Sequence, residues 1–133
     1  MFGFGVKRKK EDLRKMTNLW MKASLLAIDI EMIKSNPTNY KTTLAFFFGP
    51  TDFYGRNYGL NQQDTMAVYI PCMAQNLDIE ANKWESIYKT IVEIATDPVY
   101  IKIMNKGINA LNDWMKTQNH SAPFILGTML KMK

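Results

Sequence analysis

Apolar residues recur at helical spacing through residues 11–34. No Gly or Pro interrupts this stretch, so the pattern predicts one long helix. Its main seam consists of Leu13, Met16, Trp20, Ala23, Ala27 and Ile30, widened by Leu19, Leu26 and Ile33. Its other side is also apolar, at Met21, Leu25, Ile28 and Met32. A surface helix has a cleaner polar side. We therefore expect this helix to be covered twice, by the later helices and again by the C-terminal residues or a second chain.

A second helix is predicted to follow Asn36-Pro37. Asn is a strong N-cap, and Pro suits the first helical position because no amide donor is needed there. Gly49-Pro50 predicts the end of this helix, since Gly suits the left-handed residue after a helix and Pro prevents extension. The β-branched and aromatic run at residues 42–48 favours a strand instead. An α+β fold, with a hairpin from residues 42–48 and 65–70, is therefore the alternative.

A third helix is predicted from about Gln62 to Leu77, with an apolar face at helical spacing. Pro71 lies inside it and should kink it, or split it at Ile70, because Pro lacks an amide donor and clashes with the preceding turn. Asn82 and Glu85 then have the spacing of a capping box, which predicts the start of a fourth helix.

The fifth predicted helix begins at Asp97-Pro98, a second pairing of an N-cap residue with Pro, and runs to about Gln118. Gly107 inside it is unfavourable for a helix. Close approach of another helix would explain this Gly, and a local break is the other interpretation.

The sequence as a whole predicts an all-α, single-domain bundle of about five helices, with a long N-terminal helix and a kinked third helix.

Two segments lie outside these helices. Residues 51–61 contain two Gly and two Asn, which predicts an irregular loop. This loop carries Tyr54, Arg56 and Tyr58, either as anchors to the core or as functional side chains. Residues 119–133 form a predicted apolar C-terminal tail, expected to pack on the bundle or on a partner.

The positive charge is concentrated near the N-terminus. The whole chain has a net charge of +5, and residues 7–15 hold six basic side chains against two acidic ones. The span from residue 16 to residue 130 has nine basic and ten acidic residues, so its net charge is −1. We expect residues 1–10 to form a flexible basic N-terminal arm in front of a helical domain at residues 11–118.

The sequence has little that points to catalysis. Cys72 is the single cysteine and His120 the single histidine, which excludes a Cys/His zinc site within one chain. No Gly-rich phosphate-binding loop is present. We expect no enzyme activity, no cofactor and no metal.

The most apolar window is too short and too charged to span a membrane. A single cysteine fits a reducing compartment, so a cytoplasmic location is expected.

The function favoured by these patterns is protein–protein interaction by a small helical accessory protein that self-associates. The predicted interface residues are Trp20, Met21, Leu25, Ile28, Met32, Phe124, Leu126 and Met129. The first alternative is nucleic-acid binding through the arm and the 51–61 loop. The residues for that surface are Lys7, Arg8, Lys9, Lys10, Tyr54, Arg56 and Tyr58. The second alternative is attachment to an anionic membrane surface through residues 2–10, where Phe2, Phe4 and Val6 precede the basic run.

Overall fold

The computed structural model describes the backbone of residues 2–131 and the side chains of residues 5–131. The helices are α1 (Phe2–Leu25), α2 (Ile30–Lys34), α3 (Pro37–Asn57), α4 (Gln62–Asn76), α5 (Trp84–Ile94), α6 (Pro98–Lys116) and α7 (Ile125–Met129). Single 3-10 turns, η1 (Ala81–Lys83) and η2 (Ala122–Phe124), precede α5 and α7. The side chains of Phe2 and Phe4, and residues 1, 132 and 133, lie outside the described part of the chain.

The all-α prediction is confirmed. No strand occurs between residues 2 and 131, and the segments of the alternative hairpin, 42–48 and 65–70, lie in α3 and α4. Residues 2–131 form seven helices rather than about five, because the first predicted helix is divided and the C-terminal tail contains a short helix. Five of the seven have eleven or more residues.

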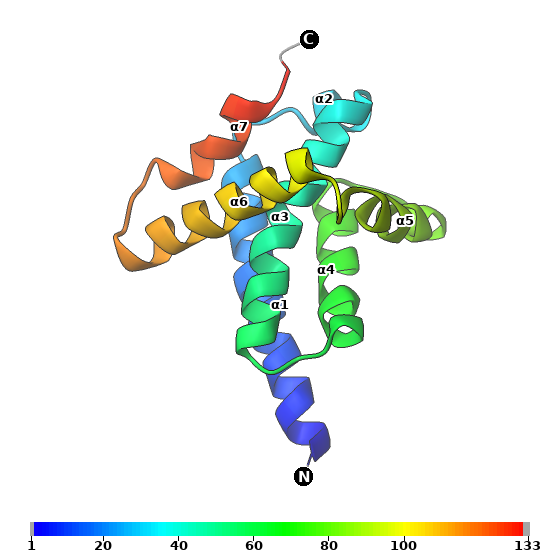
Figure 1. The fold of residues 1–133 in the computed structure, drawn as a ribbon, viewed down its shortest axis with the longest axis vertical. Helices are drawn as coiled ribbons and strands as arrows, with labels where there is room; N and C mark the ends of the chain where they lie inside the picture. Colours follow the sequence, from blue (N-terminus) through cyan, green and yellow to red (C-terminus); the bar gives the residue numbers. More distant parts are fainter. Residues whose placement is uncertain (1, 132–133) are drawn as a thin grey trace.

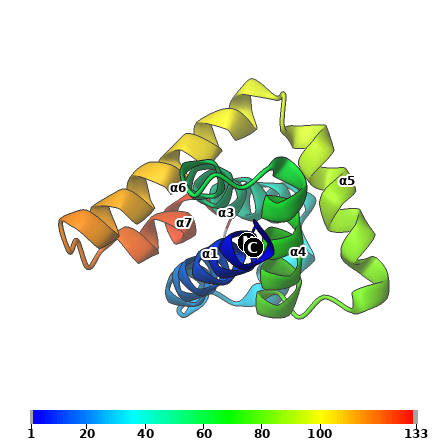
Figure 2. The ribbon, with the colours of Figure 1, turned by 90° about the horizontal axis from the view of Figure 1, so that it is seen from below.

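The central element is α3 (Figures 1 and 2). Residues 42–51 of this helix are all buried, because α3 packs against α1, α2, α4, α5, α6 and α7. The apolar and β-branched run that favoured a strand is therefore a helix buried on every side, where packing overrides local preference. The first helix, which the sequence predicted to be covered on two sides, lies at the side of α3 and keeps one face exposed.

The prediction that the second helix ends at Gly49-Pro50 is wrong, since α3 continues through both residues to Asn57. A Cβ added at Gly49 would overlap the backbone carbonyl of Met104 in α6, and one added at Gly107 would overlap the carbonyl oxygen of Phe46 in α3. Pro50 has no amide to donate to that Phe46 carbonyl one turn earlier. The two glycines thus allow α3 and α6 to cross with their backbones in contact, and the close-approach interpretation of Gly107 is correct.

The boundaries of the first helix also differ from the prediction. It begins at Phe2, so residues 2–10 belong to α1 and do not precede it as a separate arm, and it ends at Leu25 rather than at Lys34. Asp29 then caps α2, with its carboxylate accepting a hydrogen bond from the Glu31 amide at 3.0 Å. Asp29 could have predicted the start of a new helix, because Asp is a common N-cap residue.

The other predicted helix starts had mixed outcomes. Asn36 and Asp97 cap α3 and α6 through their side chains, as predicted. The predicted cap at Asn82 is wrong, because α5 begins at Trp84 after the turn η1 and has no side-chain cap. The helix α4 continues past Pro71 and is not split at Ile70.

The C-terminal residues pack on the chain itself. The turn η2 and helix α7 contact α1, and Leu126 is fully buried. Asn39 of α3 holds the end of this segment, with its Oδ1 accepting from the Lys131 amide at 2.8 Å and its Nδ2 donating to the Lys131 carbonyl at 3.0 Å. The same Nδ2 donates to the Met32 carbonyl at 3.2 Å. The predicted contact between the C-terminal segment and the first helix is therefore confirmed.

We expect Asn39→Ala to lower the free energy of unfolding by about 2 kcal/mol, because a buried side chain loses bonds to two separate segments. Hydrogen exchange gives the specific readout: the Lys131 amide should exchange much faster in the variant. Asn109→Ala, at an exposed position of α6, is the matched control and should change neither quantity. Unaltered protection of the Lys131 amide in Asn39→Ala would contradict this role.

Candidate functional site

The first candidate site is an apolar patch formed by one face of α1, the α1–α2 connection and α7, here called the α1–α7 patch. It consists of Leu19, Ala23, Leu26, Ala27, Ile28, Met32, Phe124 and Gly127. Leu26 is 88% exposed, Phe124 62% and Leu19 61%. Leu19 and Ala23 share a face of α1 because they are four positions apart, and Leu26 follows directly after the last residue of the helix. Large apolar side chains gathered at this exposure are typical of an interface.

The α1–α7 patch also has a hollow of about 350 Å³. Small residues form much of its lining: Ala23, Ser24 and Ala27 from the α1 side and Gly127 from α7. A Cβ added at Gly127 would meet a single atom, Ile28 Cδ1 at 3.9 Å, so this Gly is not required by packing within the described chain. The patch thus combines a protruding Leu26 with a shallow apolar depression.

The predicted interface residues fall into two groups. Trp20, Met21, Leu25 and Leu126 are buried in the chain's own core, so they are not exposed to a partner. Ile28, Met32 and Phe124 lie in the α1–α7 patch, and Met129 is half-buried in α7. Leu19 and Leu26, which the sequence assigned to the core seam, are exposed instead.

The predicted buried face and the observed buried face of α1 differ for a physical reason. The buried face of α1 includes Thr17 and Ser24, two small polar residues that a hydrophobic pattern does not identify. The Thr17 hydroxyl lies 3.5 Å from the Thr51 hydroxyl of α3, which shows how closely the two helices approach. The face of α1 that packs against the core is therefore rotated about the helix axis, away from the apolar face that the sequence predicted to be buried.

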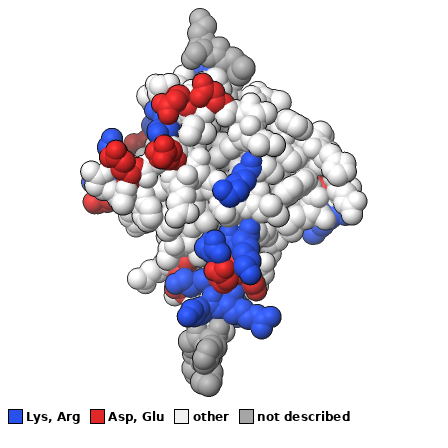
Figure 3. Space-filling model, turned by 180° about the vertical axis from the view of Figure 1, so that it is seen from behind, with Lys and Arg blue, Asp and Glu red and all other residues white. Residues whose placement is uncertain are grey.

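The second candidate site is the basic end of α1, defined as Lys7, Arg8, Lys9, Lys10, Arg14 and Lys15. In Figure 1 the first turns of α1 project beyond the other helices, and in Figure 3 the basic side chains gather there. A broad area with few charged side chains adjoins them on the same side of the molecule in Figure 3. The clustering of charge predicted from the sequence is thus also a clustering in space.

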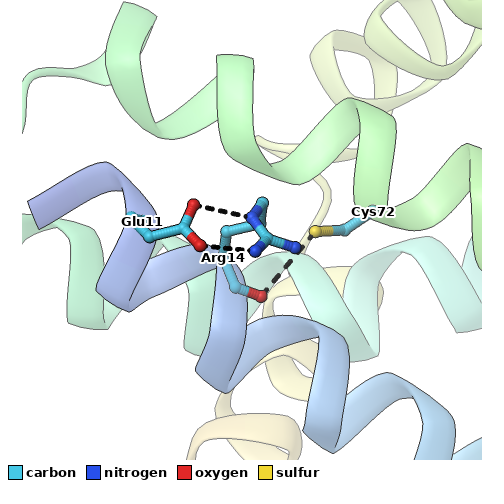
Figure 4. A network of polar contacts seen from close by, with 3 residues as sticks. All are labelled: Glu11, Arg14 and Cys72. Atoms are coloured by element: carbon cyan, nitrogen blue, oxygen red, sulfur yellow. Dashed lines mark hydrogen bonds and ion pairs between the residues drawn. The ribbon is translucent and has the colours of Figure 1, made fainter. Parts of the chain in front are cut away.

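Two of these six side chains have acidic partners. Figure 4 shows Arg14 donating to the Glu11 carboxylate, with Nε at 2.9 Å and a second guanidinium nitrogen at 2.5 Å. These hydrogen bonds lower the pKa of Glu11. Lys10 lies 3.9 Å from the Asp64 carboxylate of α4. Among the described residues, Lys7, Arg8, Lys9 and Lys15 form no ion pair.

The predicted 51–61 loop is wrong for its larger part, because residues 51–57 complete α3. Tyr54 is half-buried and donates its hydroxyl proton to Asn112 of α6, so it holds two helices together. Arg56 pairs with Asp52 one turn earlier at 2.9 Å, with its side chain largely exposed. Burial raises the pKa of Asp52 in spite of this partner. Of the hypothetical nucleic-acid surface, Tyr54 and Arg56 thus have partners within the fold.

The same Asp52 and Arg56 line a hollow of about 540 Å³ between α3, α4 and α5. Its other walls are largely apolar, including Phe48, Met66 and Ile91. Sequence reasoning missed it, because its lining comes from residues far apart along the chain. A carboxylate and a guanidinium that neutralise each other leave little polar chemistry for a ligand, so this hollow carries no functional assignment.

No catalytic arrangement is found around the single thiol. Cys72 is 3% exposed, and its Sγ lies 4.0 Å from the Arg14 carbonyl oxygen (Figure 4). Burial raises the pKa of Cys72, which disfavours the reactive thiolate. His120 lies exposed after the end of α6, on a different element. Across residues 2–131, no three His, Cys, Asp or Glu side chains gather as metal ligands would.

Comparisons with protein-family models, curated proteins and solved structures found no match to this chain. None of the helices within residues 2–131 combines the length and the apolar content needed to cross a bilayer. The functional argument therefore depends on the two surfaces described above.

Proposed function

We propose that this protein is a non-catalytic interaction protein that self-associates through the α1–α7 patch. The observation that carries the proposal is the exposure of Leu26, the largest among the big apolar side chains of the described chain, beside a depression lined by small residues. An exposed Leu in water contributes an unfavourable hydration free energy that burial in an interface removes.

A second copy of the chain is the occupant that this surface fits. A twofold interface uses the same patch on both subunits, so the patch must be complementary to itself. The proposed contact places each Leu26 in the partner's hollow, which Ala23, Ala27 and Gly127 frame. The patch has one acidic side chain at its margin, Asp29, so a symmetric contact brings together few like charges.

Leu26→Asp is expected to convert a dimer into a monomer. Because Leu26 is 88% exposed, the change removes little packing within one chain and should leave the melting temperature of the monomer unaffected. Two buried carboxylates in a symmetric interface would weaken association by about 30-fold or more. Sedimentation equilibrium at about 100 µM protein, well above a micromolar Kd, is the measurement.

Two further variants make this test specific. Val99→Asp, at a 62% exposed apolar position where α6 begins, adds the same charge away from α7 and should remain a dimer (Figure 2). Gly127→Leu fills the hollow and should also dissociate the dimer, while a Cβ there has room within one chain. A wild-type protein that is strictly monomeric at this concentration, or a Leu26→Asp variant that still dimerises, would overturn the proposal.

A further inference from the structure

The four consecutive basic residues at positions 7–10 surround α1 rather than lining one side of it. Successive residues of an α-helix are rotated by about 100°, so four in a row point in all directions around the axis. The surroundings of each residue agree with this geometry. Lys9 Nζ lies over the α3–α4 turn, 3.5 Å from where a Gly59 Cβ would be, whereas Lys10 faces Asp64 of α4. Arg8 lies in a separate hollow with Asp12 and Lys15. We call residues 7–10 the basic ring.

The basic ring has no evident role in stabilising α1. Cations near the start of a helix oppose its dipole, and although this effect fades beyond the first turn, it does not become favourable. Lys7, Arg8 and Lys9 are all exposed and have no acidic partner among the described residues. Repulsion among these cations is offset only in part, by Glu11 and Asp12 in the same hollow and by Asp64 beside Lys10. An external anionic surface would compensate it.

The position of the ring along the molecule indicates the shape of that surface. The apolar side of α1 is already buried against the fold, with Leu13 and Trp20 almost fully covered, so α1 does not lie flat on a partner through that side. Its first turns instead project from the fold (Figure 1). A ring of charge around a projecting helix suits an end-on contact with a plane of phosphates. Contact along a nucleic-acid groove would use a stripe on one face.

The order of residues along α1 supports the same orientation. Residues 2–6 are uncharged, with Phe at positions 2 and 4 and Val at position 6, and the basic ring follows immediately. Between α1 and α4, beside the ring, is a hollow of about 470 Å³. It is lined by Val6, Lys7, Lys10, Glu11, Arg14, Ala67, Val68 and Pro71. Lys10 and Arg14 have acidic partners, so Lys7 is the cation of this hollow that stays available to an anionic headgroup beside the apolar walls.

We propose that the basic ring binds the anionic surface of a lipid bilayer, with α1 approaching end-on and residues 2–6 directed toward the membrane. The ring supplies the attraction to lipid phosphates and carboxylates, and Val6, which is exposed directly ahead of it, adds apolar contact. Each is a weak signal alone, and stable attachment of a peripheral protein requires two. The proposal is independent of self-association, although a dimer with two rings would bind vesicles more tightly.

The test is sedimentation of the full chain with vesicles of phosphatidylcholine, with or without about one quarter phosphatidylserine, a typical anionic content. Wild-type protein should bind the vesicles that contain phosphatidylserine but not those of phosphatidylcholine only. Added salt should release it. The variant Lys7→Gln/Arg8→Gln/Lys9→Gln should bind about 100-fold more weakly, since each basic residue near the surface contributes about fivefold. Because these three residues form no described ion pair, the melting temperature should be unchanged.

The matched control is Lys102→Gln/Lys106→Gln/Lys116→Gln, which removes the same charge from exposed positions of α6. It should retain binding within about threefold, because long-range attraction alone is screened at physiological salt. Equal loss in both triple variants would overturn the proposal, and so would equal binding to neutral vesicles or no vesicle binding at all. Displacement from anionic vesicles by an equimolar single-stranded or duplex oligonucleotide would also overturn it and would identify a nucleic acid as the ligand. The Leu26→Asp variant should still bind the anionic vesicles. A failure of the self-association proposal can therefore be distinguished from a failure of the membrane proposal.

Discussion

Replacing Gly107 with Ala is expected to destabilise the protein by about 3 kcal/mol, although Ala is the better helix former. An added methyl at this position would overlap the Phe46 carbonyl oxygen of α3. Because that atom belongs to the backbone of the central helix, it is not free to move as a flexible side chain would be. The crossing of α3 and α6 must widen, and the side chains on both sides of it lose contact.

Urea unfolding followed by circular dichroism measures this effect. Gly5→Ala in α1 and Gly127→Ala in α7 are the matched controls, since an added Cβ has open space at the first and an ordinary contact of 3.9 Å at the second. Both should leave stability unchanged or raise it by about 0.5–1 kcal/mol through helix propensity alone. A Gly107→Ala variant as stable as these two would contradict the backbone contact between α3 and α6.

Trp20→Ala is expected to have the largest effect, a loss of about 3–5 kcal/mol, which would leave much of the protein unfolded at 37 °C. Trp20 is 1% exposed and joins α1 to two other helices. Its ring centroid lies 6.1 Å from that of Phe46 in α3 and 5.2 Å from that of Trp114 in α6. Removing it leaves a cavity where three helices meet.

Two neighbouring substitutions separate this role from that of an exposed interface residue. Trp20→Phe keeps most of the aromatic contact and removes an indole N–H that has no hydrogen-bond partner among the described residues, so its loss should be markedly smaller. Leu19→Ala alters the adjacent, 61% exposed position and should lower the free energy of unfolding by less than about 1 kcal/mol. Thermal unfolding at low protein concentration makes the comparison. Similar losses for Leu19→Ala and Trp20→Ala would contradict the assignment of faces on α1.

The helical class and two helix starts followed from local chemistry. Asn36 and Asp97 were identifiable because capping depends on a few adjacent residues. The clustering of charge at residues 7–15 was identifiable for the same reason, since neighbours in sequence on one helix remain neighbours in space. The basic end of α1 was therefore largely predictable, apart from its being helical from Phe2 onward.

The features that depend on distant parts of the chain were not predictable. Gly49 and Gly107 have the same residue type and the same role, yet only Gly107 was interpreted as a close approach, because Pro50 made Gly49 resemble a helix end. Thr17 and Ser24 face the core although they are polar. The buried face of α1 therefore differs from the one that the hydrophobic pattern predicted, and Leu26 is exposed. The α1–α7 patch thus depended on packing between helices, and a single sequence contains no direct record of that packing.

The bond between Asn39 and Lys131 joins residues 92 positions apart, and it has a consequence for synthesis of the chain. A ribosome releases α1 and α3 long before Trp114 and Lys131 leave its exit tunnel. During that interval the apolar side of α1 lacks α6 and α7, and the nascent chain exposes the surfaces that later form its core. Closure must wait until Lys131 has left the tunnel, so we expect chains that stop before this residue not to reach the native fold. Stalled shorter chains should be captured by chaperones and cut readily by proteases.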